Sequence, residues 1–408
     1  GCIPTLCALR VCAVCPCVSG AAHGQPTSRA LRIHTQRVYS TLTLPSLPPL
    51  VLLTPAPNFG ETLAVSGDWA IISAPQEWVS ETDDSSDRGA VFMYHDVDGV
   101  WEEHSRLALP SETETLLYIG QHVAIDGEWA AYGTNTLDRY GRAAGSIVGL
   151  YHLTDNEWVL HYSFVSHATF AYDVSMAAGL LVLAYPYAEK HKGAAEVYRL
   201  VGSEYVLETT LVGKRIGMEV CASVAISGDG SRILLGSNYE GHVYIYDYDS
   251  ESTGDMWGLT TEIETGCSPQ QTVHIGYSSL PFIAADWLDS EETGMVQVYD
   301  FEEGASDPVL MQTMVGASED TDFGSSVAIS SDADASTIAI SATQSSSVFV
   351  YRRDGRGHYY LADSEFYAPE WELCASVALA RGDTLLMAGA PGADNGRGVV
   401  EEYDLSTL

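Results

Sequence analysis

Carboxylates are the residues of this sequence best placed to do chemistry, and they gather in polar loops between apolar segments. Carboxylate oxygens can hold a hard cation or meet the basic groups of a partner, and they can also serve only to keep a loop solvated. Two loops carry the candidate binding residues, which are Asp83, Asp84 and Asp87 in the first loop and Asp286, Asp289, Glu291 and Glu292 in the second. We expect these loops to present a negative surface to a partner.

No catalytic motif accompanies these carboxylates. The sequence has no phosphate-binding glycine loop, no HExxH, no GxSxG and no convincing Ser/His/Asp set, although these patterns carry much of the known phosphoryl-transfer, metalloprotease and acyl-transfer chemistry. The twelve histidines are scattered along the chain. We therefore predict no catalytic residue and no cofactor.

The chain is strongly acidic, with 55 Asp and Glu residues against 19 Lys and Arg residues and a formal net charge of −36. Such a surface would repel phosphate groups, which argues against nucleic acid as a partner and disfavours anionic membranes. We expect the charge to keep a large β-protein soluble, in a salty or extracellular medium, and to concentrate cations near it.

The elements that must position the loops come from an internal repeat. The stretch from Asn58 to Leu109 recurs in seven versions, spaced roughly 50 to 60 residues apart. Its apolar runs are short, rich in Val, Ile, Tyr and Leu, and bounded by turn residues, as is typical of β-strands. One such sheet cannot cover both of its apolar faces, so the copies must stack. The pattern predicts an all-β fold, a seven-bladed β-propeller of four-stranded antiparallel blades.

Three recurring positions define the register of the repeats. A tyrosine closes the third strand of every copy, at Tyr94, Tyr151, Tyr198, Tyr246, Tyr299, Tyr351 and Tyr403. Five residues earlier stands Gly89, Ser146, Gly193, Gly241, Gly294, Ser346 or Gly398. A small residue marks the first strand, at Ala64, Ala124, Ser175, Ala225, Ala328 and Ala378, and the copy between Gln270 and Asp286 is too degenerate to place its own. Small residues suit innermost strands because these crowd towards the central axis.

The N-terminal part of the chain is predicted to close the ring. The seventh copy stops at Leu408 without a fourth strand, whereas residues 38–45 resemble the fourth strand of the first copy. We predict that 38–45 completes the last blade, that the proline-rich residues 45–57 connect it to the first blade, and that the propeller spans 37–408 as a monomeric ring. Residues 1–36 form a cysteine-rich leader, interpreted either as the remnant of a secretory signal or as a disordered or wrongly assigned segment. No transmembrane segment is predicted.

The repeated phrase resembles the FG-GAP repeat, the unit of the seven-bladed propeller of integrin α chains and of many microbial and protist surface proteins. The "FG" is literal at Phe59-Gly60 and Phe323-Gly324, and the "GAP" at Gly389-Ala390-Pro391. The resemblance covers residues 38–408 and implies a role in adhesion or protein binding. The family often binds Ca²⁺ in the first hairpin of a blade, and here Asp332 and Asp334 are the nearest match. Two carboxylates fall short of the six to eight oxygens that Ca²⁺ takes.

We therefore expect a non-catalytic binding or adhesion propeller that recognises a protein or glycan partner at or outside the cell surface. One alternative is a propeller enzyme, a hydrolase or lyase acting on glycans with carboxylates in the central channel. The feature that would favour it is a set of acidic or histidine residues that converge in the channel with perturbed pKa values. His122 lies in a predicted innermost strand, where it would either face that channel or serve as a hydrogen-bonded structural histidine, and we expect the structural role. The other alternative is a structural scaffold.

Overall fold

The computed structural model describes residues 50–52, 56–75, 89–108, 115–137, 143–166, 173–217, 219–237, 241–252, 255–265, 271–275, 282–286, 294–301, 307–316, 322–330, 335–343, 345–367 and 375–406. The chain divides into two compact units, Gly1–Leu47 and Pro48–Leu408, and every described residue belongs to the second. Within the described residues, no helix is long and apolar enough to cross a membrane. The predicted leader, 1–36, lies outside them.

The described residues form seven four-stranded antiparallel sheets, each running from an innermost to an outermost strand. We call them blades 1 to 7 in chain order. Blade 1 holds β2 (Leu63–Ser66), β3 (Trp69–Ala74), β4 (Ala90–Val97) and β5 (Val100–Arg106), and blade 2 holds β6 (Thr115–Asp126), β7 (Trp129–Leu137), β8 (Ala143–Thr154) and β9 (Glu157–Ser166). Blade 3 holds β10 (Asp173–Ala177), β11 (Leu180–Tyr185), β12 (Ala194–Val201) and β13 (Glu204–Val212).

The remaining blades follow the same order of strands. Blade 4 holds β14 (Val220–Ile226), β15 (Arg232–Ser237), β16 (His242–Tyr248) and β17 (Trp257–Glu264). Blade 5 holds β18 (Gln271–Ile275), β19 (Phe282–Asp286), β20 (Met295–Phe301) and β21 (Pro308–Val315). Blade 6 holds β22 (Phe323–Ile329), β23 (Thr337–Ala342), β24 (Ser347–Arg353) and β25 (Tyr359–Tyr367). Blade 7 holds β26 (Ser376–Ala380), β27 (Leu385–Ala390) and β28 (Val399–Asp404), with β1 (Leu50–Leu52) at its outer edge.

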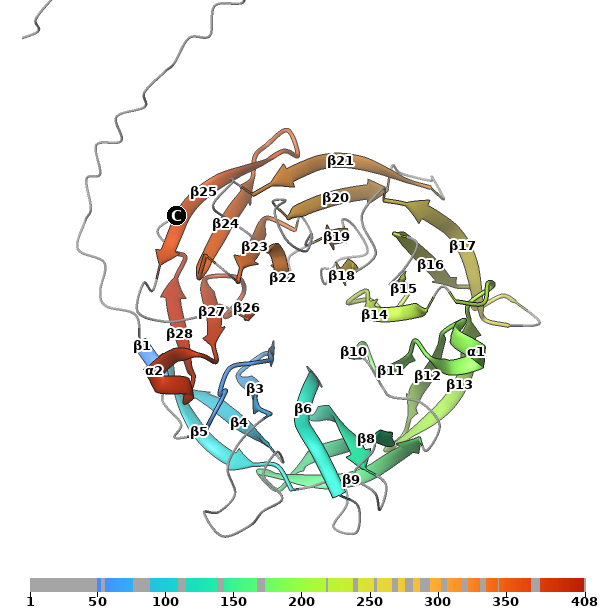
Figure 1. Cartoon of the computed structure of the whole chain (residues 1–408), viewed down its shortest axis with the longest axis horizontal. Helices are drawn as coiled ribbons and strands as arrows, with labels where there is room; N and C mark the ends of the chain where they lie inside the picture. The colour runs from blue at the N-terminus through green and yellow to red at the C-terminus, as the bar shows by residue number, and fades with distance from the viewer. Residues whose placement is uncertain are drawn as a thin grey trace, which may run out of the picture. The chain divides into compact units, whose positions relative to one another are not determined.

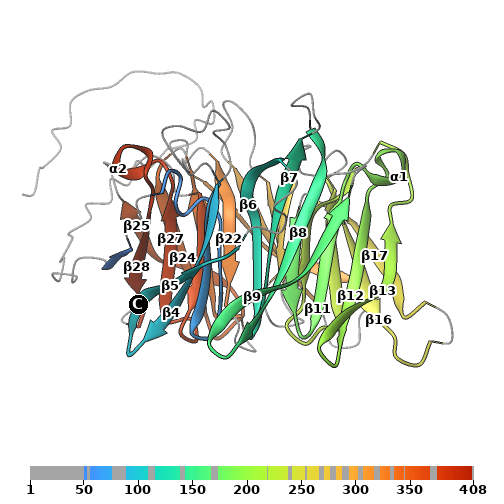
Figure 2. The same ribbon diagram turned by 90° about the horizontal axis from the view of Figure 1, so that it is seen from below.

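The blades of this unit stand around a central axis, as Figure 1 shows from above and Figure 2 from the side. Each innermost strand contacts the innermost strand of the next blade, and β26 of blade 7 contacts β2 of blade 1. The predicted β-propeller of four-stranded antiparallel blades is confirmed. Apolar side chains fill the seams between neighbouring blades, and the seam between blades 7 and 1 is packed around the fully buried Phe59.

The outermost strand of blade 7 does not come from the predicted segment. Residues 38–45 lie outside the described residues, and the position beside β28 that they were expected to fill is taken by β1, with Leu50 opposite Glu402 and Leu52 opposite Val400. That assignment was wrong. The pairing residues belong to the stretch that was predicted to be only a proline-rich connection. Leu50-Val51-Leu52 is a short β-prone run between prolines, and prolines at the ends of an edge strand do not interrupt its ladder.

The marker tyrosine has a structural counterpart, a β-bulge between the third and fourth strands. In blades 1 to 6 the pairing register shifts immediately before this tyrosine, for example between Met93 and Tyr94 and between Val197 and Tyr198. The extra residue lies on the outer strand, as at His104 in blade 1 and Glu208 in blade 3. A bulge bends its strand and increases the local twist. The repeat therefore encodes the curvature of the outer strand at a fixed position.

The tryptophans that open fourth strands pack against the preceding blade. Trp101, Trp158 and Trp257 are 3%, 8% and 4% exposed. The Trp158 ring meets Trp69 of blade 1 edge-on at 5.4 Å, and the indole N–H of Trp257 donates to Glu208 of blade 3 over 2.8 Å. Their periodicity therefore reflects packing between blades rather than a sugar-binding surface.

The small residue missing from the degenerate copy can now be placed. In every other blade, the marker tyrosine pairs with a residue of the second strand, and the small residue pairs with the next residue of that strand. In blade 1, for example, Tyr94 pairs with Ala70 and Ala64 pairs with Ile71. In blade 5 the tyrosine pairs with Phe282, so the equivalent pair is His274 and Ile283. Blade 5 thus has a histidine where the other blades have alanine or serine, so its innermost strand departs from the repeat pattern.

Candidate functional site

A belt of polar residues lies two positions before the small residue of each innermost strand. Its members are Thr62, His122, Asp173, Ser223, Ser326 and Ser376, and Thr272 occupies the same register position in blade 5. The hydroxyl of Thr62 donates a hydrogen bond to the carbonyl oxygen of Gly120 in blade 2, over 2.9 Å. The hydroxyl of Ser376 donates to the carbonyl oxygen of Gly60 in blade 1, over 2.8 Å. Ser326 accepts from the backbone N–H of Val377 in blade 7, over 3.2 Å. The belt links one blade to the next.

His122 and Asp173 are the members of this belt that could do acid–base chemistry. The Nδ1 atom of His122 lies 3.7 Å from Oδ1 of Asp173, and a quarter of each side chain, 25%, remains accessible. Burial raises the pKa of Asp173 to about 7, although hydrogen bonds from the backbone N–H groups of Val224 and Val174 oppose the rise. Burial lowers the pKa of His122 to about 4. Both shifts favour the uncharged forms, as expected where protein replaces water.

The carboxylate of Asp173 is engaged in the same link that serine provides in other blades. Its Oδ2 accepts from the N–H of Val224 in blade 4 and its Oδ1 from the N–H of Val174, both over 2.8 Å. The N–H of Val224 thus donates to Asp173 across the seam between blades 3 and 4. In the same way, the N–H of Val377 donates to Ser326 across the seam between blades 6 and 7. This equivalence indicates that Asp173 holds blades 3 and 4 together.

Replacing Asp173 with serine should preserve the link and change the pH dependence of stability. Because the pKa of Asp173 is above its ordinary value of 3.8, the stabilisation it contributes is complete below pH 3.8 and is lost as the pH rises through about 7. The free energy of unfolding of Asp173→Ser, relative to the unmodified protein, should therefore increase between pH 4 and pH 8, on the order of 1–2 kcal/mol. The opposite contribution of His122 is common to both proteins. Urea unfolding at several pH values measures the difference, and a difference that does not vary with pH would contradict the raised pKa of Asp173.

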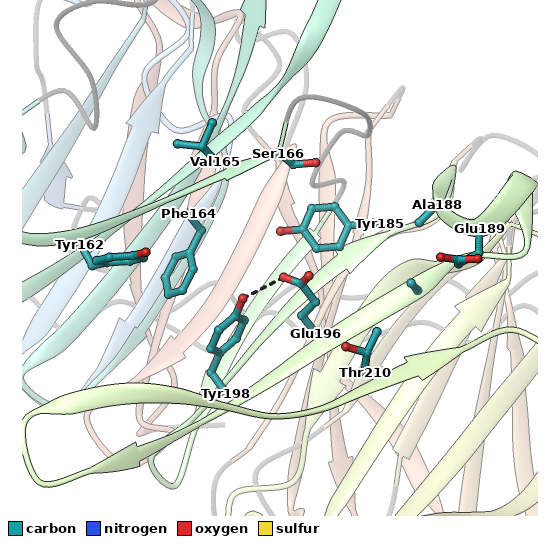
Figure 3. A pocket seen from close by; sticks show the side chains of 11 residues that line it. Tyr162, Phe164, Val165, Ser166, Tyr185, Ala188, Glu189, Glu196, Tyr198 and Thr210 are labelled. Carbon is teal, nitrogen blue, oxygen red and sulfur yellow. Dashed lines mark hydrogen bonds between the residues drawn. The ribbon is translucent and has the colours of Figure 1, made fainter.

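A groove lies between blades 2 and 3. It has a volume of about 370 Å³ and opens beside the outer ends of the two blades (Figure 3). Its lining consists of Tyr162, Phe164, Val165 and Ser166 of β9, Tyr185 of β11, Ala188 and Glu189 of α1 (Ala188–His191), Ala194, Glu196 and Tyr198 of β12, and Thr210 of β13. Its size lies in the lower range of small-ligand pockets, about 300–1,000 Å³.

Strand alternation explains why these side chains meet. Residues two apart on a strand share a face, so Ala194, Glu196 and Tyr198 turn together towards blade 2, whereas Ala195 and Val197 of the same strand pack in the core between blades 3 and 4. Glu196 pairs with Thr210 of β13, which therefore lies on the same face. The groove is thus the outer part of a seam that apolar residues would otherwise fill.

Three aromatic rings form a continuous wall in the groove. The Phe164 ring meets Tyr162 nearly edge-on at 4.9 Å and Tyr198 at 4.7 Å with a tilt of 56°. Tyr162 is 56% exposed and the neighbouring Val165 is 50% exposed. Exposed aromatic and aliphatic side chains beside a cavity are typical of recognition surfaces.

A carboxylate borders this wall beside Tyr198. The hydroxyl of Tyr198 donates to Oε2 of Glu196 over 2.9 Å, and burial, together with the nearby Glu196 carboxylate, raises the pKa of both Tyr198 and Tyr185. Tyrosine also bonds to the side chain two residues earlier in blades 5 and 7, at Tyr299–Gln297 and Tyr403–Glu401. Those two acceptors are each only 8% exposed, whereas Glu196 is half-buried and borders the cavity. Only in blade 3, among these three, does the pair face a groove.

The loop that carries Glu189 is a variant of the "GAP" segment. In blades 3 and 7 this segment forms a single left-handed turn, α1 and α2 (Ala393–Gly396), with φ of 51° at Glu189 and 48° at Asp394. Both turns end in hydrogen bonds to an alanine carbonyl, as from the N–H of Gly193 to Ala188. The segment joins the second and third strands, so Glu189 occupies the same class of loop as the predicted acidic clusters.

The predicted binding residues cannot be compared with the groove. Asp83, Asp84, Asp87, Asp289, Glu291 and Glu292 lie outside the described residues, and so do Asp332 and Asp334. Asp286 ends β19, but its side chain is not among those described. These assignments remain predictions. Within the part of the chain that the structure describes, no group of three or more His, Cys, Asp or Glu residues could hold a metal ion.

The groove residues were missed in the sequence because each matches its repeat position or an ordinary strand pattern. Tyr198 is a marker tyrosine, and Tyr162 and Phe164 lie two apart on a fourth strand. One signal was available: Glu196 is a charged residue between Ala195 and Val197 in a strand that is apolar at this position in blade 1, where Phe92 stands. A charge at an expected packing position must find a polar partner or an opening in the seam. The equivalent Glu401 of blade 7 has the first, in Tyr403, and Glu196 has both.

No protein-family model matches the sequence, and no curated protein matches it either. Solved structures resemble its fold. The β-propeller domain of Cps50 (Swd1) from Myceliophteria thermophila superposes with a TM-score of 0.59 and 12% identity, covering 88% of this chain and 100% of that one. Two Bacteroides proteins provisionally named 6-phosphogluconolactonases are also similar. The B. uniformis protein has a TM-score of 0.55 and 14% identity, and the match covers 79% of this chain and 89% of that one. The B. fragilis protein has a TM-score of 0.54 and 9% identity, and the match covers 78% of this chain and 86% of that one. At these identities the likeness concerns the fold alone.

Proposed function

We propose that this chain is a non-catalytic propeller that binds a protein partner in the groove between blades 2 and 3, at or outside the cell surface. The observation that carries the proposal is the groove itself, an aromatic wall bordered by a half-buried carboxylate beside exposed Tyr162 and Val165. Binding residues are often carried by loops and surfaces that a rigid repeat scaffold leaves free to vary. The surface location rests on the acidic composition, the leader and the FG-GAP resemblance.

A display library of protein fragments and a glycan array, both probed with the purified chain, test this proposal. The double variant Tyr162→Ser/Val165→Ser removes the exposed apolar part of the groove. Val159→Ser is the matched control, because Val159 is 49% exposed on the same strand and does not line the cavity. We expect fragments that bind the unmodified chain and the control but bind the double variant at least tenfold more weakly. Ligands that are only glycans, or binding equal in all three proteins, would contradict it.

A second candidate is an enzyme that acts on a glycan at the central channel. The meeting of His122 and Asp173, with pKa values moved towards 4 and 7, favours it. General acid–base catalysis needs a group that titrates near the working pH. If this candidate is correct, His122→Asn should abolish turnover of a polysaccharide while the melting temperature stays within a few degrees. The belt role of Asp173 makes the binding proposal the better supported.

A further inference from the structure

We infer that the groove between blades 2 and 3 takes the guanidinium group of an arginine side chain from the partner protein. This inference rests on the proposed function and specifies the chemistry that the groove recognises. Arginine presents five N–H donors in a planar group, and that plane can also lie against an aromatic ring. The groove offers both complements, a carboxylate and three rings.

The chain itself repeats this arrangement between its own residues. Arg199 is bonded to Glu208, with its guanidinium carbon 4.6 Å from the centre of the Tyr248 ring. Arg232 is bonded to Asp247, with that carbon 3.7 Å from the centre of the Phe301 ring. Equivalent triplets of arginine, carboxylate and aromatic ring are Arg353, Asp300 and Tyr359, and Arg381, Asp96 and Trp101. Four arginines of the described chain therefore lie between a carboxylate and a ring.

The groove contains two parts of this triplet and lacks the third. Glu196 supplies the carboxylate, and the rings of Tyr162, Phe164 and Tyr198 supply the aromatic wall. No residue that lines the cavity, among those the structure describes, is lysine, arginine or histidine. Lys190 follows Glu189 in α1 but is not part of the lining. An arginine from another protein would complete the arrangement.

The carboxylate retains the capacity to accept a guanidinium. An ionised carboxylate has about four lone-pair sites, and the Tyr198 hydroxyl occupies one of those on Oε2. The other lone-pair sites can accept a charge-assisted bond from the ligand. Glu189 adds a second negative charge at the mouth of the groove (Figure 3). The net charge of −36 would further attract a basic partner.

The ring geometry favours an inserted side chain over a sugar. Tyr162 and Phe164 are inclined by 70°, and Phe164 and Tyr198 by 56°. Rings inclined in this way do not form one flat platform on which a pyranose could stack. A guanidinium needs only one ring face together with the carboxylate edge.

A peptide pair that differs only in charge tests the inference. The probes are acetyl-Gly-Gly-Arg-Gly-Gly-amide and the same peptide with citrulline, which keeps the shape of arginine but is neutral. Binding to the full chain is measured by saturation-transfer NMR at low and high salt. We expect the arginine peptide to bind at least tenfold more tightly than the citrulline peptide and to weaken as salt increases.

Three variants separate recognition in the groove from general attraction to an acidic protein. Glu196→Gln keeps an acceptor for Tyr198 but removes the charge, and Tyr162→Ala removes an exposed ring; each should weaken arginine binding at least fivefold. Glu157→Gln is the matched control, because Glu157 is an exposed residue of the same strand, β9, outside the lining. It makes the same change in net charge and should alter binding less than twofold. Melting temperatures show whether each variant folds.

The outcomes distinguish this inference from the proposed function. Equal binding of both peptides, or an equal loss in Glu157→Gln, would overturn the arginine assignment. If neither peptide binds but the protein fragments still distinguish Tyr162→Ser/Val165→Ser from its control, the groove binds a protein through other chemistry and only this inference fails. If the fragments fail as well, the proposed function fails with it.

Discussion

Replacing Gly398 with alanine should destabilise the protein by about 3 kcal/mol more than the same replacement at Gly67, through overpacking against a neighbouring backbone. Both glycines have positive φ, 78° and 58°, so the conformational cost of alanine is common to the two variants. A Cβ at Gly398 would lie 2.1 Å from the carbonyl oxygen of Phe59, where the start of blade 1 crosses blade 7, whereas nothing lies within 4 Å of one at Gly67. Urea unfolding of the two variants measures the difference.

The expected effect follows from a contact that recurs around the ring. A Cβ at Gly193 would lie 1.8 Å from the carbonyl oxygen of Val220 in blade 4, and one at Gly294 would lie 1.9 Å from that of Phe323 in blade 6. In blades 3, 5 and 7 the marker glycine is therefore a point of close approach by the backbone of the next blade. Equal stability of Gly398→Ala and Gly67→Ala would show that the nearby backbone of the next blade does not restrict which residue can occupy the marker position.

Replacing Phe59 with alanine should lower the free energy of unfolding by about 3–5 kcal/mol, the usual cost of truncating a fully buried phenylalanine. Phe59 is 0% exposed, and its ring lies 5.7 Å from that of Phe92 and 5.9 Å from that of Tyr94. The same cluster includes Met387 and Val400 of blade 7, so the cavity would open in the seam between the last blade and the first. A thermal melt or urea titration gives the value.

Phe59→Leu is the control for the loss of apolar volume. Leucine retains most of the buried surface and should cost under about 2 kcal/mol. The equivalent Phe323 of blade 6, 1% exposed beside Phe349, should respond to alanine like Phe59, because both stand in the literal "FG" of their repeats. A cost below about 1 kcal/mol for Phe59→Ala would mean that the seam rearranges to fill the cavity.

The sequence by itself determined the class of fold. Short β-prone runs, spaced as strands and repeated in register, cannot bury their faces except by stacking, and that requirement leads to a propeller whatever the loops contain. The spacing of the marker tyrosines also located the third strand of every blade, because strand period and turn chemistry are local properties. The same local signals could not reveal that Leu50–Leu52, rather than 38–45, pairs with β28. The choice between two apolar segments depends on which one reaches the free edge.

The candidate site was decided by the tertiary structure alone. Tyr162 and Glu196 are separated by 34 positions in the sequence and belong to different repeats, each ordinary in its own strand. The two residues line one groove only because blades 2 and 3 diverge there instead of packing closely. Asp173 is a carboxylate at a position where five other repeats have serine or threonine and blade 2 has His122. Its role depends on the N–H of Val224 in the next blade, which donates to it. Repeats specify what each blade is, whereas contacts between blades exist only after the ring has formed.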